Sequence, residues 1–302
     1  MTMISCENVS KFYGRKNALH NLNISIRENT ITGLVGKNGA GKTTLLKLIA
    51  GHIYPSSGEV RVLNEDPFNN LFVSANTIFI KDSMEFTNGL NLMELLEMGE
   101  RFYPNWDMEF AKSLFSYFQL DELSYYDELS KGMKSTFNTI VGLASRCPLT
   151  LFDEPTSGMD ASVRKDFYRA LLKDYLRHPR TFIISSHYLD EIEDLLEDLL
   201  LIDGGEKKLH KPIDEVKNYA VNIMGDSNLL ENQIPAENIL AKKRIDESSS
   251  SYIVINDERI ASLKRSNFNV QPVSPKDVTI YLTDKKGDID DVFQSSNTNG
   301  YR

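Results

Sequence analysis

The sequence has few cysteines, no long apolar run and no excess of basic charge. Cys6 and Cys147 are the only cysteines among 302 residues. They are too few for a disulfide framework and lack metal-ligand spacing, which is typical of a reducing compartment. No run of about 18 apolar residues occurs, and the first residues lack the basic flank and apolar segment of a signal peptide. The sequence therefore predicts a cytoplasmic protein without a membrane span, which reaches a membrane only through a partner.

The charge balance argues against nucleic acid as a partner. Lys and Arg number 34 and Asp and Glu number 43, which leaves a formal net charge of −9 at pH 7. An acidic chain has no general electrostatic attraction to phosphate backbones or to anionic lipid. Hydrophobic residues make up 41% and charged residues 25%, as in ordinary globular proteins. We therefore expect a folded chain of about two domains.

Hydrophobic patterns indicate an α/β core with a helical insertion. Residues 1–35 contain short alternating runs, which predict strands of an antiparallel sheet and then a buried strand. Apolar runs at 149–152 and 181–184 flank an amphipathic segment at 163–176, and this βαβ pattern implies a parallel sheet. Residues 88–147 carry helical spacing instead, so we expect a helical subdomain there.

The remainder of the chain predicts a smaller unit. We place the end of the core domain, 1–208, where the α/β pattern stops, and expect a small α+β accessory domain at 209–288. Its predicted elements are strands at 219–223 and 252–255, a loop at 248–251 and a helix at 257–264. Residues 289–302 are polar without apolar periodicity, so we expect a flexible tail.

A glycine-rich motif lies between the buried strand and a helical run. Residues 36–43, GKNGAGKT, fit G-x-x-x-x-G-K-[ST] in the context that this motif requires. Backbone N–H groups of such a loop surround a phosphate, and the N-terminus of the next helix adds positive potential. We predict that Lys42 contacts the β and γ phosphates of a nucleotide and that Thr43 is a ligand of Mg²⁺. A glycine-rich turn that binds nothing is the alternative, and the flanking elements disfavour it.

Two acidic residues follow the apolar run at 149–152. An acid at the carboxyl end of a buried parallel strand faces the ligand crevice of an open α/β sheet. Asp153 is expected to hold the magnesium ion through water, and Glu154 to polarise an attacking water molecule. A solvated strand end is the alternative, which the neighbouring phosphate loop disfavours.

These residues together resemble the ATP-binding subunit of an ABC transporter over about residues 1–208. The sequence LSKGM at 129–133 is similar to the family's L-S-G-G-Q signature and departs from it at the third and fifth positions. The resemblance implies a P-loop NTPase core with an antiparallel β subdomain and a helical subdomain. In the family this segment begins a helix and binds the γ-phosphate of an ATP molecule held by the opposite subunit. Ser130, a predicted N-cap, and Gly132 are therefore expected to complete a site in trans.

The resemblance assigns roles to four further residues. Tyr13 is similar to the aromatic residue that stacks on adenine, and Asp160 lies in a segment similar to the D-loop, which ties two subunits together. His187 resembles the switch histidine, which contacts the γ-phosphate and helps to hold water and Glu154. Asp82 stands at the position of the Q-loop glutamine, where a carboxylate can ligate Mg²⁺ but cannot donate a hydrogen bond as an amide does.

The predicted site thus combines catalytic, nucleotide-binding and metal-binding residues. Catalytic roles are predicted for Lys42, Glu154 and His187, nucleotide binding for Tyr13, Gly36, Asn38, Gly39, Ala40, Gly41, Lys42, Thr43, Thr44, Asp82, Ser130, Gly132 and Asp160, and magnesium binding for Thr43, Asp82 and Asp153.

The resemblance implies a motor that binds ATP and Mg²⁺ and drives a separate integral-membrane permease at the inner face of the cell membrane. The motor is expected to be a homodimer or a heterodimer with a related ABC ATPase. The segment YPNWD at 103–107, the LSKGM variant and the C-terminal domain resemble bacterial ABC-2-type exporter ATPases, so export of drugs, peptides or lipids is expected. Two alternatives stay open: an ABC-type ATPase without a permease, and a nucleotide sensor with a regulatory role.

Overall fold

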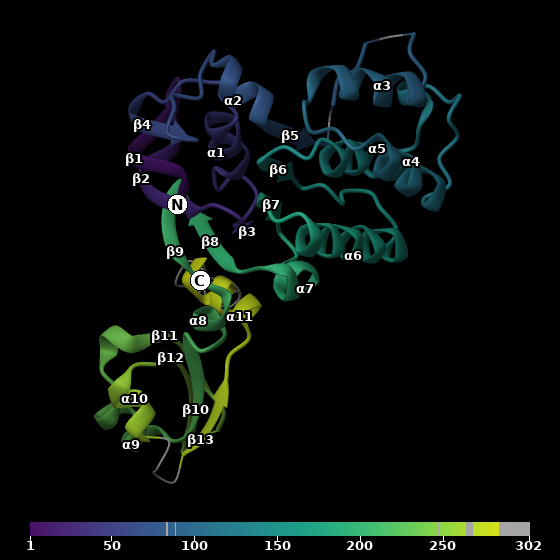
Figure 1. Ribbon diagram of the computed structural model, residues 1–302. Coiled ribbons are helices and arrows are strands. Elements are labelled where there is room, and N and C mark those ends of the chain that lie inside the picture. The colour runs from purple at the N-terminus through teal and green to yellow at the C-terminus, as the bar shows by residue number, and fades with distance from the viewer. Residues whose placement is uncertain (83, 88, 247, 264–267, 284–302) are drawn as a thin grey trace, which may run out of the picture.

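A six-stranded, mostly parallel sheet lies at the centre of the N-terminal part of the molecule (Figure 1). The computed structural model describes residues 1–82, 84–87, 89–246, 248–263 and 268–283. The strands, in their order across the sheet, are β5 (Thr77–Lys81), β6 (Leu149–Asp153), β7 (Thr181–Ser186), β3 (Ile31–Val35), β8 (Asp198–Asp203) and β9 (Glu206–Pro212). Only the edge strand β9 runs antiparallel to its neighbour among the described strands of this sheet. The predicted parallel βαβ arrangement is confirmed.

Alternate side chains of the central strands enter two different cores. Leu151 and Ile183 pack into a cluster with Leu45 of the helix α1 (Lys42–Ile49) and with the antiparallel sheet. Phe152 and Ile184 point to the other side and join a cluster that contains residues of the long helices. Because both faces are covered, strands β3, β6 and β7 are buried along their whole length, as is usual for parallel sheets.

The predicted antiparallel sheet is confirmed, with a third strand that the sequence patterns did not indicate. Its order is β2 (Lys16–Arg27), β1 (Thr2–Tyr13) and β4 (Ser57–Val62). The short helix α2 (Leu71–Asn76) follows and leads into β5. The tip of the β1–β2 hairpin lies close to the predicted phosphate loop, and the two strands carry Tyr13 and Lys16 to the edge of a cleft over this loop.

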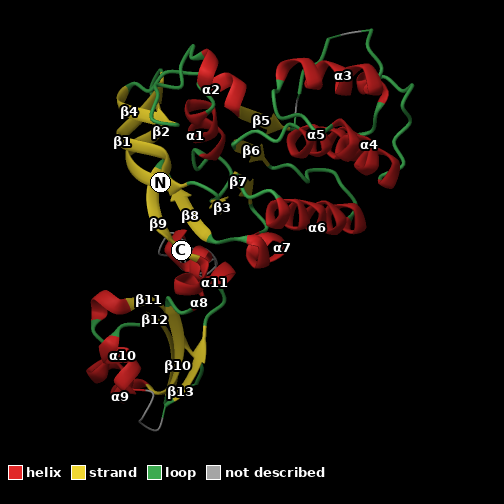
Figure 2. Cartoon of the chain, in the orientation of Figure 1, coloured by secondary structure: helices red, strands yellow, loops and turns green. Residues whose placement is uncertain are grey.

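Three helices occupy the region with helical spacing, beside β5 at the edge of the sheet (Figure 2). They are α3 (Leu92–Phe102), α4 (Met108–Tyr117) and α5 (Lys131–Ala144), and each begins at a polar N-cap: Asn91, Asp107 and Ser130. An N-cap side chain satisfies one of the free N–H groups of the first helical turn. Two further helices, α6 (Ala161–Arg177) and α7 (Leu189–Ile192), connect β6 to β7 and β7 to β8.

The C-terminal part has its own four-stranded antiparallel sheet. The strand order is β11 (Ile239–Arg244), β12 (Ser249–Ile255), β10 (Ala220–Asp226) and β13 (Asn269–Pro272), with helices α8 (Ile213–Lys217), α9 (Ser227–Gln233), α10 (Glu258–Leu263) and α11 (Pro275–Thr283). A separate cluster that includes Ile223, Leu230 and Tyr252 forms its core. The end of the predicted accessory domain, 284–288, and the predicted tail at 289–302 lie outside the described residues.

The predicted loop at 248–251 is wrong, because β12 begins at Ser249. Ser250 is only 2% exposed and pairs with Gly225 across the sheet. Its hydroxyl oxygen lies 2.7 Å from that of Ser227, so the buried polar group is satisfied. A serine run carries no apolar alternation, and the sequence pattern therefore could not reveal that the strand predicted at 252–255 already begins at Ser249.

Helix α11 connects the C-terminal part back to the N-terminal part of the chain. Lys276 at its start forms an ion pair with Asp190 of α7, with 3.3 Å between Nζ and Oδ2. At its end, the Thr283 carbonyl oxygen accepts a hydrogen bond of 2.9 Å from Nζ of Lys37, which belongs to the phosphate loop. The helix thus contacts the segments that follow β3 and β7.

Candidate functional site

The phosphate loop has the backbone conformation that its glycines predict. Gly39 and Gly41 adopt φ angles of +81° and +111°, in the left-handed region that favours glycine. Gly36 lies so close to β8 that a Cβ atom there would stand 2.2 Å from the carbonyl oxygen of Ile202. The loop can therefore turn its N–H groups inward only with glycine at these positions, as a phosphate cradle requires.

The first two residues of α1 connect the phosphate loop to the end of β6. Lys42 is 7% exposed, and its Nζ donates a 2.6 Å hydrogen bond to the Gly36 carbonyl and lies 3.5 Å from Oε1 of Glu154. Thr43 Oγ1 donates a 2.7 Å hydrogen bond to Oδ2 of Asp153. The structure thus brings together four of the predicted residues from segments that are about 110 positions apart.

The same oxygens fit a magnesium ion. Mg²⁺ prefers hard oxygen ligands and usually keeps several waters besides one or two protein groups and phosphate oxygens. The Thr43 hydroxyl and the Asp153 carboxylate supply two such groups side by side. Among the described residues no cluster of three or more His, Cys, Asp or Glu side chains could hold a metal ion by itself.

Glu154 lies between a cation and an imidazole. Its Oε2 is 2.7 Å from Nδ1 of His187, and its Oε1 faces the Lys42 ammonium. Its φ angle of +51° is uncommon for a residue with a side chain, and the chain turns directly after it, where Ser157 N–H donates to the Glu154 carbonyl. The predicted catalytic residues Lys42, Glu154 and His187 are therefore neighbours in space.

Ser185 is a residue of this site that the sequence analysis missed. Its hydroxyl donates a 2.7 Å hydrogen bond to Oδ1 of Asp153 and accepts a 2.9 Å bond from the backbone N–H of Glu154. The side chain is fully buried. The signal that could have found it is strand register, since Asp153 and Ser185 are paired residues of the adjacent strands β6 and β7. One hydroxyl group thereby orients both acids.

A cleft of about 220 Å³ runs over the phosphate loop. Its lining residues are Tyr13, Lys16, Ala18, residues 37–44, Asp153 and Glu154. The Tyr13 side chain is 46% exposed at the tip of the β1–β2 hairpin, and Lys11 Nζ lies 5.4 Å from the centre of its ring. An exposed aromatic face at the mouth of a phosphate cleft suits a flat base. Lys16, another lining residue, was not predicted.

The signature segment, residues 129–133, lies outside this cleft. Ser130 caps α5, as predicted, by accepting a hydrogen bond from Met133 N–H at 3.3 Å. A Cβ atom on Gly132 would stand 2.6 Å from the Gly158 carbonyl oxygen, so the helix start packs closely on the turn that contains the predicted D-loop. Ser130, Gly132, Asp82 and Asp160 line no part of the described nucleotide cleft. The predicted residues therefore form two groups on one chain.

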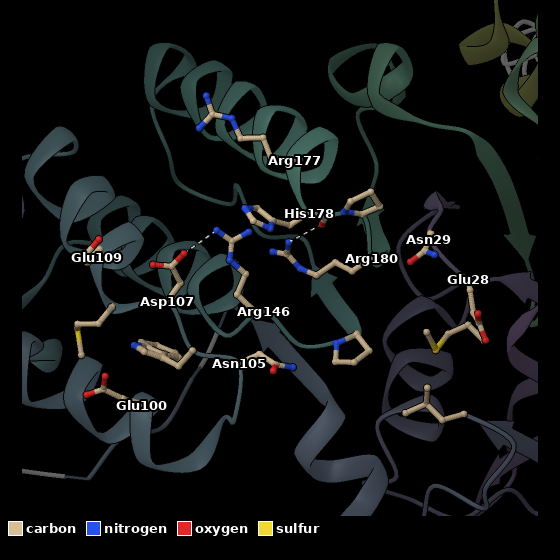
Figure 3. A pocket seen from close by; sticks show the side chains of 16 residues that line it. Glu28, Asn29, Glu100, Asn105, Asp107, Glu109, Arg146, Arg177, His178 and Arg180 are labelled. Carbon is tan, nitrogen blue, oxygen red and sulfur yellow. Dashed lines mark hydrogen bonds and ion pairs between the residues drawn. The ribbon is translucent and has the colours of Figure 1, made fainter.

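A larger hollow, of about 1120 Å³, lies beside the starts of β3, β6 and β7, and Figure 3 shows the side chains that line it. Two of its arginines are held in ion pairs: Arg146 with Asp107, which also lines the hollow, at 2.9 Å, and Arg180 with the buried Asp174, which lies behind the wall, at 2.8 Å. Burial lowers the pKa of the Arg180 guanidinium, and Asp174 opposes this shift. No phosphate-loop residue lines the hollow, so its size does not make it the nucleotide site.

Comparison with known proteins agrees with this geometry. A family model described as "ABC transporter" matches residues 19–157. The ABC transporter ATP-binding protein YtrB of Bacillus subtilis is 28% identical over 289 residues, which cover 92% of this chain and 97% of YtrB. The bacitracin transport ATP-binding protein BcrA of Bacillus licheniformis is 28% identical over 219 residues, or 72% of each chain.

The matched part of the chain is an ABC transporter ATPase. A solved structure of an ATP-binding subunit of an ABC transporter has the same fold, with a TM-score of 0.64 and 22% identity over 72% of this chain and 92% of that one. A dimeric post-hydrolysis state of the cassette MJ0796, bound to ADP and Pi, gives a TM-score of 0.63 with 21% identity over 70% of this chain and 99% of that one. Among the described helices of this ATPase, none has the length and apolar character needed to cross a membrane.

Replacing Ser185 by alanine tests the hydroxyl bridge. The change leaves the buried N–H of Glu154 without an acceptor and removes a donor from Asp153, which misorients both acids. We expect kcat for ATP hydrolysis to fall about ten- to hundred-fold, as for other residues that orient a ligand or a base. Steady-state phosphate release measures this change.

The matched control is Ser186→Ala, because the hydroxyl of this neighbouring buried residue bonds only within its own loop, to Tyr188. The control should retain most of the wild-type rate. Equal rates for the two variants would contradict the bridging role of Ser185.

Proposed function

We propose that this ABC ATPase works as a pair of ATP-binding subunits that drives the export of a drug, peptide or lipid through a separate membrane permease. The observation that carries the proposal is the division of the site. The phosphate loop, Asp153 and Glu154 line one cleft, whereas the capped start of α5 lies elsewhere on the same chain. A second subunit that faces the first head to tail would bring Ser130 of one chain to the nucleotide of the other.

The chemistry of hydrolysis follows from the residues around the cleft. Lys42 and the loop N–H groups would neutralise negative charge on the phosphates, a preorganised electrostatic effect. Glu154 would orient water for in-line attack on the γ-phosphorus, and His187, hydrogen-bonded to its carboxylate, would hold that side chain in place. Thr43 and Asp153 would hold Mg²⁺, which when bound offsets charge on the phosphate oxygens.

The contribution of the second subunit is an anion-binding helix start. Ser130 caps α5 and the first N–H groups of this helix have no intrahelical acceptor, so the segment suits a phosphate group. Asp160 stands at the N-cap of α6 without a side-chain capping bond, which leaves its carboxylate available for a contact between subunits. The dimers of the similarly folded MJ0796 cassette support such a pairing. The subunits would be two copies of this chain or this chain and a related ATPase.

The permease and the direction of transport are supported by relatives. YtrB is described as an ABC transporter ATP-binding protein, and BcrA as a bacitracin transport ATP-binding protein. Since none of the described helices can cross a membrane, transport by this chain would require a membrane-spanning partner. The subunit would then act at the inner face of the cell membrane.

Glu154→Gln tests the hydrolytic mechanism and the pairing together. The amide keeps the size of the side chain but cannot act as a carboxylate base, so kcat should fall at least about hundred-fold while ATP still binds. With Mg-ATP bound, size-exclusion chromatography with light scattering should give the variant twice the mass of one chain. If the partner is a related ATPase, the variant should co-elute with that protein.

Glu109→Gln on the exposed face of α4 is the control for Glu154→Gln and should hydrolyse ATP like the wild type. A Glu154→Gln variant that turns over normally would remove this residue from the mechanism. A variant that holds ATP yet stays a monomer, with or without other polypeptides of the source cell, would contradict the pairing.

Purification from detergent-solubilised membranes tests the permease. A tagged chain, expressed in its source cell, should retain one hydrophobic polypeptide with several membrane spans in a fixed stoichiometry. That polypeptide should raise the ATPase rate when both are placed in lipid vesicles. Recovery of the chain alone, from solubilised membranes as well as from the soluble fraction, would contradict the proposed partner.

A further inference from the structure

Two residues that depart from the ABC motifs contact each other. Asp82 stands where the family has the Q-loop glutamine, and Lys131 is the third residue of the signature segment. Nζ of Lys131 lies 3.1 Å from Oδ2 of Asp82. The two positions are far apart in the sequence, and each departure provides the charge that the other needs. An ion pair thus joins the end of β5 to the first residue of α5.

The pair lies next to the machinery already described. Lys81, the residue before Asp82, is paired in the sheet with Asp153, the proposed magnesium ligand. Asn138 of α5 donates a 3.4 Å hydrogen bond to the Lys81 carbonyl, which gives the helix a second contact with the same strand end. Residues 81 and 82 therefore both contact α5, one through its backbone carbonyl and the other through its side chain.

The Lys131 side chain is confined on its way to Asp82. Gly158 adopts a φ angle of +79°, and a Cβ atom there would stand 2.8 Å from Cγ of Lys131. The lysine stem therefore passes directly over the turn that contains the predicted D-loop. The two charged side chains are 60% and 44% exposed, but the stem between them lies against this turn.

Electrostatics explains why the lysine needs a partner. A cation in the first turn of a helix opposes the helix dipole, whose N-terminal end is positive. The first turn of α5 has no acidic residue, so its own sequence does not compensate Lys131. Asp82 supplies this compensation from another element. Exposed ion pairs contribute only about 0–1 kcal/mol to stability, so the fold should survive loss of the pair and its variants can be compared as folded proteins.

We propose that the Asp82–Lys131 ion pair positions the start of α5, and with it Ser130, relative to the catalytic end of β5 and β6. Asp82 acts through Lys131, in place of the amide of a glutamine, and both are positioning residues. The proposal rests on the role in ATP hydrolysis given above to Ser130. This role differs from the predicted role of Asp82 as a magnesium ligand. In the proposal the carboxylate acts by its charge on Lys131, and its oxygens do not bind the ion.

Exchanging the two charges tests the pair. Asp82→Lys and Lys131→Asp, made singly, place like charges opposite each other, and each should lower kcat about fivefold or more. The double variant restores an ion pair of the same reach and should return kcat to within about twofold of the wild type. If kcat of the double variant falls by the product of the two single fold-changes, the charges act independently and the proposal is overturned.

Magnesium dependence separates the two roles of Asp82. If Asp82 is a positioning residue, Asp82→Asn lowers kcat, and the Mg²⁺ concentration for half-maximal activity is unchanged. If Asp82 is a magnesium ligand, this concentration rises in both Asp82 variants and stays high in the charge-exchanged protein, since lysine cannot bind the ion. The second result would overturn the proposal.

Hydrogen exchange of the nucleotide-free chain supplies a readout that does not depend on hydrolysis. The single variants should exchange the amides of residues 130–136 faster, and the double variant should exchange them at the wild-type rate. The control is the exposed pair Lys211–Glu215, whose charge exchange should leave α5 unaffected. Unchanged exchange in the single variants would overturn the positioning role. If the variants show the expected exchange but the wild-type chain does not hydrolyse ATP, only the proposed function is contradicted.

Discussion

The hydrogen-bonded bridge from Thr43 through Asp153 to Ser185 is the interaction on which the site depends. It joins the start of α1 to the ends of the adjacent strands β6 and β7 by bonds of 2.7 Å on each side of one carboxylate. Because Asp153 is 7% exposed, these bonds are not exchanged freely with water. The bridge also holds the backbone of Glu154, and so it fixes the proposed catalytic carboxylate relative to the phosphate loop.

Several other segments contact the region where the phosphate loop meets the ends of β6 and β7. The signature segment is held against the turn after Glu154 by the close approach of Gly132 to Gly158, and against β5 by the pair of Asp82 with Lys131. The C-terminal part reaches the same region through α11, which contacts the phosphate loop at one end and α7 at the other. The signature segment, β5 and α11 therefore all contact residues close to the proposed nucleotide site.

Local motifs made much of the site predictable. Glycines that need positive φ angles, a helix that begins at Lys42 and two acids after an apolar strand are all encoded by neighbours in the sequence. Ser185 and the ion pair of Asp82 could not be predicted in this way, because strand register and helix packing bring their partners from distant segments. The start of β12 at Ser249 was missed for a different reason: hydroxyl side chains are buried there by pairing, without apolar alternation.

Equilibrium titration of ATP, with Mg²⁺, against the wild-type chain and Lys42→Ala tests the central claim most directly. The wild type should bind one nucleotide per chain, and loss of the buried ammonium should weaken the affinity at least about tenfold, since hydrogen bonds from a charged donor are worth about 1.5–3 kcal/mol. Lys47→Ala, at the other end of α1, should bind like the wild type. Equal affinities for the wild type and Lys42→Ala would contradict the assignment of residues 36–43 as the loop that binds the triphosphate.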